Sequence, residues 1–130
     1  MLIALAFLLH LIIPKRIGTG RVGRLLGWGW MVVGGGLAVM ATRAAGNVDL
    51  ESPRRLVSEG PYAISRHPMY VGWTLAYGGL AVVTGNLWLV FLFPVLVGLV
   101  HLETAKEERA LRSHFREDYD TYMTRVRRYL

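Results

Sequence analysis

The sequence predicts an all-α integral membrane helical bundle with three to four transmembrane helices and an amphipathic C-terminal helix. Hydrophobic residues make up 53% of the 130-residue chain, and the mean hydropathy is +0.36. Three runs contain no charged residue: Met1 to Pro14, Leu25 to Thr42 (18 residues) and His67 to Leu102 (36 residues). A charged side chain costs about 2.5–3.5 kcal/mol in hydrocarbon even on a permissive insertion scale, so such runs are typical of a bilayer-embedded chain.

The first uncharged run is short for a membrane span. At about 1.5 Å per residue, a helix of this length covers only about 20 Å. It has no basic start and no small-residue cleavage site, and Lys15 and Arg16 follow it directly, which is unlike a removable signal peptide. The sequence therefore predicts either a short, tilted span or a segment lying at the membrane interface.

The second run, Leu25 to Thr42, is long enough to cross a hydrocarbon core of about 30 Å. It is rich in glycine, which in lipid allows helix backbones to approach one another closely. Two interpretations follow: the glycines pack against a neighbouring helix, or they form a groove against which a ligand lies. The glycines of this run are Gly27, Gly29, Gly34, Gly35 and Gly36.

The third run would form a helix of about 54 Å, which is too long for one span. Gly85-Asn86, near its middle, is a strong turn signal. We therefore expect a helical hairpin, with residues 69–83 crossing in one direction and residues 87–102 returning.

The tail from Glu103 to Arg128 is predicted to form one amphipathic helix, because apolar and aromatic residues recur at steps of three and four. Extending this stripe backward from Leu111 by fours reaches Glu107 and Glu103. Both carboxylates are then expected to face the protein body, with Glu108 nearer the polar side. A carboxylate on a buried face needs a partner or a ligand, which makes Glu107 a candidate site residue.

Charge and composition exclude several functions. The net charge is +6, but lysine and arginine lie beside the apolar runs, where they meet lipid headgroups, so we expect the lipid bilayer and not nucleic acid as the partner. The absence of cysteine excludes disulfides, thiolate catalysis and thiolate metal sites, and the histidines lack metal-ligand spacing, so no metal is expected. Nothing in the sequence specifies an oligomeric state.

The distribution of charge also predicts an orientation. Eleven of the fifteen lysine and arginine residues lie in the loop 43–66 or after Leu102, which places these parts and the C-terminus in the cytoplasm. The chain is expected to form one domain, 1–130. Its parts are N-terminal helices (1–42), a cytoplasmic motif loop (43–68), the hairpin (69–102) and a cytoplasmic C-terminal helix (103–130).

The segment from Gly60 to Gly72 carries the strongest functional signal. Prolines at positions 61 and 68 restrict its backbone, and Arg66, His67 and Tyr70 follow one another at the entrance to the hairpin. A rigid loop that presents a cation, an imidazole and a phenol at the membrane surface is suited to holding a polar ligand, so these three are the candidate catalytic residues. The alternative is that they only anchor the chain at the interface.

Two stretches resemble the isoprenylcysteine carboxyl methyltransferase family. The first is Arg66-His-Pro-Met-Tyr-Val-Gly-Trp73, and the second is the tail from Glu107 to Val126. The resemblance covers about residues 47–126, with the motifs in family order around a hairpin of matching length. It implies a helical membrane enzyme that binds S-adenosyl-L-methionine near the cytoplasmic face and methylates a lipid-like or small apolar acceptor.

The resemblance also implies site residues. The implied cofactor contacts are Asn47, Arg54, Leu56, Val57, Tyr62, His67, Pro68, Met69, Tyr70 and Glu107. The chain departs from the family at its substrate residues: Arg43 is the nearest cation to the family's substrate pair, and Glu103 stands where the family has a substrate arginine. An acidic Glu103 suits a neutral or cationic acceptor better than a carboxylate. Two alternatives are a noncatalytic membrane subunit and an NADPH-dependent enzyme resembling sterol reductases.

Overall fold

The structure is a computed structural model that describes residues 1–46 and 55–130. Within these residues the chain is all-helical, with five α-helices, one short 3-10 helix and no β-strand. The elements are α1 (Leu2–Ile12), α2 (Arg21–Ala45), η1 (Gly60–Ala63), α3 (Pro68–Thr84), α4 (Leu87–Phe115) and α5 (Glu117–Arg125). The all-α class predicted from the sequence is confirmed.

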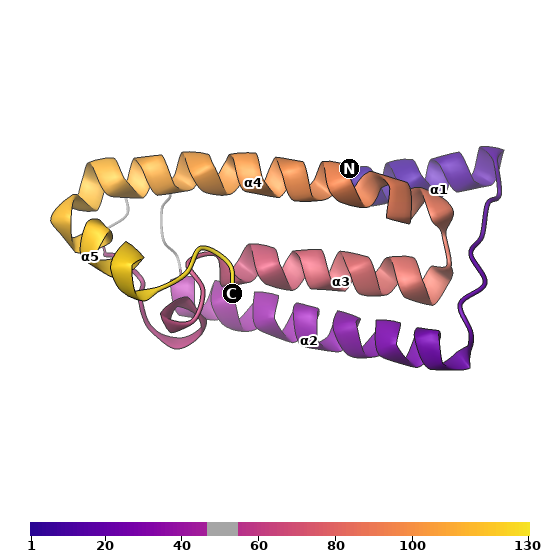
Figure 1. Ribbon diagram of the computed structural model, residues 1–130, viewed down its shortest axis with the longest axis horizontal. Coiled ribbons are helices and arrows are strands. Elements are labelled where there is room, and N and C mark those ends of the chain that lie inside the picture. The colour runs from indigo at the N-terminus through magenta and orange to yellow at the C-terminus, as the bar shows by residue number, and fades with distance from the viewer. Residues whose placement is uncertain (47–54) are drawn as a thin grey trace.

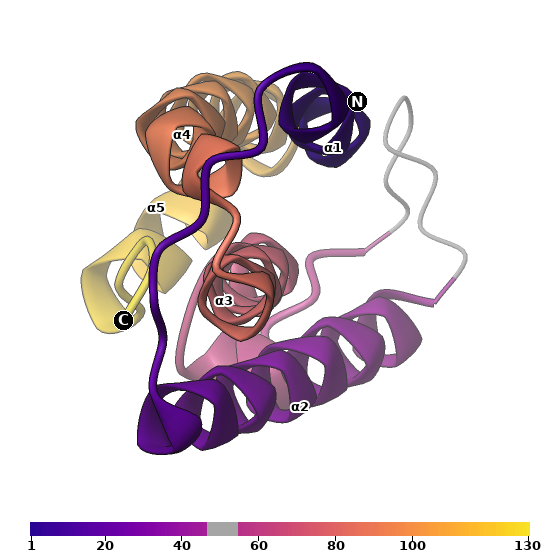
Figure 2. The same ribbon diagram turned by 90° about the vertical axis from the view of Figure 1, so that its right-hand side faces the viewer.

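The long helices form two pairs that run along the same direction (Figure 1). Helix α2 packs against α3 along most of its length, and α1 packs against the first half of α4. Seen along the helices, the α1–α4 pair lies above the α2–α3 pair (Figure 2). Helix α5 and the C-terminal residues lie at one end of the molecule, and the α3–α4 turn lies at the other.

Glycines bring α2 and α3 into backbone contact. A Cβ atom added to Gly34 would lie 2.5 Å from the carbonyl oxygen of Gly72, and one added to Gly79 would lie 2.5 Å from that of Gly27. Such contacts allow two helices to associate through close packing in lipid. The packing interpretation therefore holds for Gly27 and Gly34, whereas a Cβ at Gly35 would meet no atom within 4 Å.

The hairpin predicted at Gly85-Asn86 is present. Gly85 adopts a left-handed conformation with φ of 60°, and the Asn86 side chain caps α4 by accepting a hydrogen bond from the Trp88 backbone N–H at 3.0 Å. The segment after α1 is fastened to this turn, because the Ile17 N–H donates to the Gly85 carbonyl at 2.7 Å. This end of the molecule is thus closed by backbone hydrogen bonds.

The prediction of one tail helix from Glu103 to Arg128 is wrong. Helix α4 continues without a break to Phe115, because the charged residues after Leu102 are strong helix formers and nothing there ends the helix. The break comes at Arg116, whose φ is 46°, and α5 then runs in a different direction (Figure 1).

Two helices, α2 and α4, are long and apolar enough to cross a membrane, and α1 is a shorter apolar helix. Large apolar side chains are exposed on the outer faces; Trp30 is 51% exposed and Phe91 64% exposed. Exposed apolar surface of this extent is typical of a face that contacts lipid. In α4 the apolar part ends at Leu102, and the charge-rich residues 103–115 continue the helix beyond it.

Candidate functional site

The part of the motif loop from Gly60 to Pro68 is shaped by the residues that made it conspicuous in the sequence. Gly60 has φ of 60°, Pro61 begins the 3-10 helix η1, and Pro68 occupies the first turn of α3, where its missing N–H costs no hydrogen bond. Between them, the Arg66 backbone N–H donates to the Arg127 carbonyl at 2.9 Å. The loop is therefore held against the C-terminal tail.

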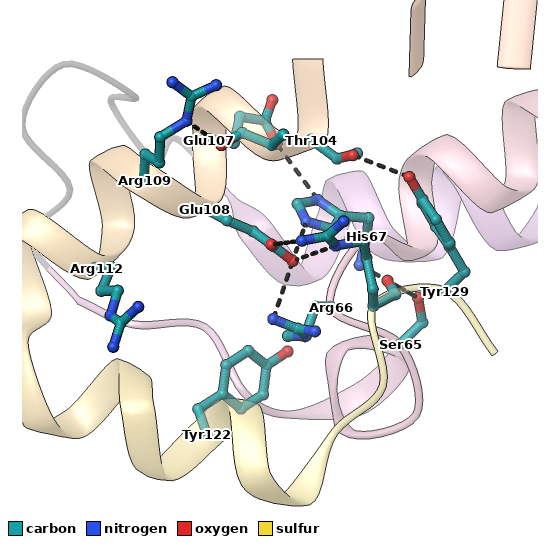
Figure 3. A network of polar contacts seen from close by, with 12 residues as sticks. Ser65, Arg66, His67, Thr104, Glu107, Glu108, Arg109, Arg112, Tyr122 and Tyr129 are labelled. Atoms are coloured by element: carbon teal, nitrogen blue, oxygen red, sulfur yellow. Dashed lines mark hydrogen bonds and ion pairs between the residues drawn. The ribbon is translucent and has the colours of Figure 1, made fainter. Parts of the chain in front are cut away.

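The His67 ring lies between two carboxylates of α4. Its Nδ1 is 3.5 Å from Glu107 Oε2 and its Nε2 is 3.3 Å from Glu108 Oε1, and the side chain is 4% exposed. The ring donates to both carboxylates only when both nitrogens carry a proton. Figure 3 shows His67 and these two residues between α4 and the tail.

The Glu108 carboxylate contacts the side chains of Arg128, Arg66 and His67. Arg128 donates through two nitrogens, with its Nε 3.1 Å from Glu108 Oε1, and Arg66 Nη1 lies 3.0 Å from the same oxygen. Together with His67 these residues form what we call the Glu108 cluster. Bidentate pairing with arginine is among the strongest arrangements available to a carboxylate.

The orientation predicted for Glu108 is wrong, because this residue is buried and does not lie on the polar side. Steps of four from Leu111 lead back to Glu107, but a step of three leads to Glu108, and the buried stripe continues from Glu108 to Thr104. Both steps keep a residue near one helix face. The packing of the motif loop and the tail decides which one is covered.

Glu107 lies at the edge of this buried region and faces a cavity. The Tyr70 hydroxyl donates to Glu107 Oε1 at 2.6 Å, and the Glu107 side chain is 27% exposed. Partial burial would raise the pKa of the Glu107 carboxyl, but hydrogen bonds from His67 and Tyr70 hold it below its ordinary value. Glu107 is thus an ionised acceptor with exposed surface.

The cavity beside Glu107 has a volume of about 280 Å³ and lies between the end of α2, the motif loop, α4 and α5. We call it the polar cavity. Two polar atoms of its lining residues are buried and have no hydrogen-bond partner among the described residues: Arg66 Nε and the Tyr119 hydroxyl. Buried donors without a partner are rare in folded proteins and indicate a place for a ligand or water.

Two further tyrosines line the polar cavity. The Tyr122 hydroxyl donates to the Tyr62 carbonyl at 2.6 Å, which joins α5 to η1. Burial, with the neighbouring Tyr119 and Tyr62, raises the pKa of Tyr122 to about 12. The phenols of Tyr62 and Tyr122 therefore stay neutral, and they supply aromatic walls and hydroxyl groups to the polar cavity.

The structure brings most of the predicted site residues together at the polar cavity. Its lining includes Leu56, Val57, Tyr62, Arg66, His67, Met69, Tyr70 and Glu107. Pro68 is buried at the start of α3 and does not line the cavity, and Asn47 and Arg54 lie outside the described residues.

The two predicted substrate residues lie apart from the polar cavity. Arg43 is exposed near the end of α2. Glu103, which was expected to face the protein body, is 53% exposed and pairs with Lys106 at 2.8 Å. The expected orientation of Glu103 is therefore wrong, since α4 turns this position toward solvent.

Sequence reasoning missed the residues that reach the site from the tail. Glu108 and Arg128 hold the motif loop in place, and Tyr119 lines the polar cavity. Arg128 gave no signal in the sequence, because its approach to Glu108 depends on the chain reversal at Arg116.

A second cavity, of about 790 Å³, lies between α3, the middle of α4 and the C-terminal residues. We call it the apolar cleft. Its walls are mostly aliphatic, and Tyr70 lines both it and the polar cavity. The two cavities therefore adjoin at one side chain. The apolar cleft is lined by Tyr70, Val71, Thr74, Leu75, Pro94, Val97, Gly98, Val100, His101, Leu102, Tyr129 and Leu130.

Comparison with known families gives one match. The model of the phospholipid methyltransferase family matches residues 22–118, well over half of the chain, and this range includes α2, the motif loop, α3 and α4. No curated protein matches the chain. The chain belongs to the phospholipid methyltransferase family, part of the isoprenylcysteine carboxyl methyltransferase-like group of membrane methyltransferases.

Proposed function

We propose that the protein transfers a methyl group from S-adenosyl-L-methionine in the polar cavity to an amphipathic lipid acceptor in the apolar cleft. The observation that carries the proposal is the shared Tyr70, which lines both cavities. A polar cosubstrate and an apolar acceptor would thereby meet without either entering the other's environment.

The chemistry of the polar cavity suits this cosubstrate. S-adenosyl-L-methionine supplies an electrophilic methyl group on a positively charged sulfur, and it carries an ammonium, a carboxylate, ribose hydroxyls and an adenine ring. Glu107 offers an acceptor for the ammonium or the ribose hydroxyls. Arg66 Nε and the Tyr119 hydroxyl, which have no hydrogen-bond partner among the described residues, are donors suited to the carboxylate, and Tyr62 offers an aromatic wall.

Methyl transfer needs alignment and the exclusion of water more than it needs a strong acid or base. The Glu108 cluster provides alignment, because the Glu108 carboxylate contacts both Arg66 and His67 and is itself held by Arg128. In this proposal Tyr70, at the junction of the two cavities, is the residue nearest the reacting atoms. His67 is a positioning residue, since both its nitrogens are already directed at carboxylates.

The acceptor is proposed to be a lipid with a neutral or cationic polar head. The apolar cleft is lined by exposed residues of α4 such as Val97 and Leu102, so an acyl chain can enter it from the bilayer. Glu107 lies at the junction, and a negative charge there disfavours an anionic nucleophile. The family description, phospholipid methyltransferase, agrees with such an acceptor.

The proposed topology places the polar cavity on the cytoplasmic side. The motif loop, the end of α4 and α5 lie at one end of the molecule, and most lysine and arginine residues lie there too (Figure 1). We propose that α3 crosses the membrane with α2 and α4, and that α1 either crosses or lies at the interface. This gives three to four spans.

Binding is the first test of this proposal. Isothermal titration calorimetry on the protein in phosphatidylcholine nanodiscs should show binding of S-adenosyl-L-methionine but not of NADPH. Glu107→Gln should weaken binding about 10-fold or more, because it removes a charge-assisted acceptor. The matched control is Glu103→Gln, on the same helix but outside the polar cavity, which should leave binding unchanged.

Two results would contradict the proposal. Wild-type protein that binds NADPH and not S-adenosyl-L-methionine would favour the reductase alternative. Equal binding by the wild type and the Glu107→Gln variant would remove Glu107 from the cosubstrate site.

A further inference from the structure

A small polar cluster lies at one end of the apolar cleft. The Tyr129 hydroxyl is 3.1 Å from His101 Nδ1 and 3.0 Å from Thr104 Oγ1, and Thr104 Oγ1 donates to the His101 carbonyl at 3.0 Å. Thr104 is fully buried, and Figure 3 shows its contact with Tyr129. The orientation of the His101 ring is therefore fixed through its Nδ1.

The other polar side chains that line the apolar cleft are already engaged. The Tyr70 hydroxyl donates to Glu107, and the Thr74 hydroxyl donates to the Tyr70 carbonyl at 2.8 Å. His101 Nε2 makes no hydrogen bond within the described part of the chain, and the His101 side chain is exposed and lines the cleft. An oriented imidazole with one free nitrogen is the usual form of a histidine that exchanges a proton.

We propose that His101 is a catalytic residue on the acceptor side, where its Nε2 takes the proton that the acceptor loses on methylation. The inference rests on the proposed function, and it takes the nucleophile of the acceptor to be a neutral lipid amine, as the family description suggests. Tyr129 and Thr104 act as positioning residues. A carboxylate acceptor would have no proton to lose, whereas an amine must lose one to end as a neutral methylamine.

Methyl transfer to the amine forms one bond at the methyl carbon and breaks another. The amine nitrogen uses its lone pair to form the new bond to the methyl carbon, and the bond from that carbon to sulfur breaks with its electron pair left on sulfur. The nitrogen then carries a positive charge, and its proton passes to His101 Nε2, which becomes an imidazolium. His101 lies at the end of the apolar run of α4, next to the charge-rich segment that begins at Glu103, where the imidazolium can pass the proton to water.

Nuclear magnetic resonance gives a test that does not depend on turnover. The protein is labelled with 15N-histidine, and spectra are compared in nanodiscs of phosphatidylcholine alone and of phosphatidylcholine with phosphatidylethanolamine. The two lipids share their chains, but only the second has an amine with protons. The His101 Nε2 resonance, assigned from His101→Asn, should shift with phosphatidylethanolamine. His114, which lies on the Phe115 ring outside the cleft, is the control and should not shift.

Kinetics gives the second test. His101→Asn keeps a polar group near the position of Nδ1 and removes Nε2, so kcat for methyl transfer to phosphatidylethanolamine should fall about 100-fold. Binding of S-adenosyl-L-methionine should stay unchanged, which also shows that the variant is folded. Tyr129→Phe should lower kcat about 10-fold, because it frees the His101 ring without removing it. His114→Asn should match the wild type.

Each outcome bears on a distinct claim. Wild-type transfer to phosphatidylethanolamine with full kcat in His101→Asn, or no shift of the His101 resonance, would overturn this inference alone. Wild type that binds S-adenosyl-L-methionine but methylates no amine lipid would overturn the amine acceptor and this inference with it. Wild type without S-adenosyl-L-methionine binding would overturn the proposed function itself.

Discussion

The α2–α3 pair and the end of the molecule that carries Glu108 are held together by different forces. In the helix pair, glycine backbones meet directly, as at Gly34 and Gly72. At the other end, one buried carboxylate, Glu108, gathers Arg66, His67 and Arg128 from the motif loop and the tail. The α2–α3 contact depends on the small volume of its glycines, and the Glu108 cluster depends on charge pairing. We therefore expect added volume to disrupt the first and loss of charge to disrupt the second.

The largest effect is expected from adding volume to the glycine contact. In Gly34→Leu the new Cβ alone would lie 2.5 Å from the Gly72 carbonyl, a backbone atom that cannot rotate away. Overpacking in a core typically costs about 1–3 kcal/mol, and a clash with backbone should exceed that range and abolish the folded state. Thermal unfolding in nanodiscs should show no cooperative transition for this variant.

The neighbouring glycine provides the control. A Cβ at Gly35 meets nothing within 4 Å, so Gly35→Leu should leave the melting temperature nearly unchanged. Equal destabilisation by both substitutions would mean that glycine content, and not the contact with α3, stabilises this helix.

The next largest effect should follow loss of the buried charge. Glu108→Gln leaves Arg66 and Arg128 without their carboxylate in a largely buried position, which costs about 3–5 kcal/mol when one partner of a buried pair is removed. Chemical unfolding should measure this loss. Glu103→Gln, which breaks an exposed pair with Lys106, should cost less than about 1 kcal/mol. Similar costs for the two variants would contradict the central place given to Glu108.

A smaller effect is expected from acid. Burial alone would raise the pKa of the Glu108 carboxyl, but the hydrogen bond from Arg128 and the charges of Arg66 and Arg128 hold it below its ordinary value. A carboxyl with a lowered pKa stabilises the fold fully above its ordinary pKa, and that contribution is lost as pH falls through the folded value. The wild type should therefore lose stability more steeply than Glu108→Gln below about pH 4.5. Parallel stability curves for the two proteins would show that Glu108 is not strongly paired.

The helical hairpin and the motif loop could be predicted because their signals are local. Gly85-Asn86 is a turn signal in itself, and the prolines at positions 61 and 68 set the ends of the loop without help from distant residues. The glycine-rich run suggested close helix packing, but only the structure separates Gly34, which contacts α3, from Gly35, which does not.

The Glu108 cluster could not be predicted, because it depends on the chain reversal after α4 and on which face of α4 the C-terminal residues cover. Arg116 takes a φ of 46° without being glycine, so no turn signal marks the end of α4. This reversal brings Arg128 back to Glu108, 20 residues earlier. A stripe at steps of three and four admits either Glu107 or Glu108 as the inner residue, and the covering tail decides between them.

The central claim is that a methyl group passes between the polar cavity and the apolar cleft at Tyr70. The most direct test uses S-adenosyl-L-methionine with a radioactive methyl group and wild-type protein in nanodiscs that contain phosphatidylethanolamine. We expect label in the extracted lipid, and a loss of about 10-fold or more in Glu107→Gln, because this substitution removes the carboxylate that accepts the Tyr70 hydrogen bond. Wild-type protein that binds the cosubstrate but leaves the lipid unlabelled, with phosphatidylethanolamine and with other lipids of neutral or cationic head, would contradict it.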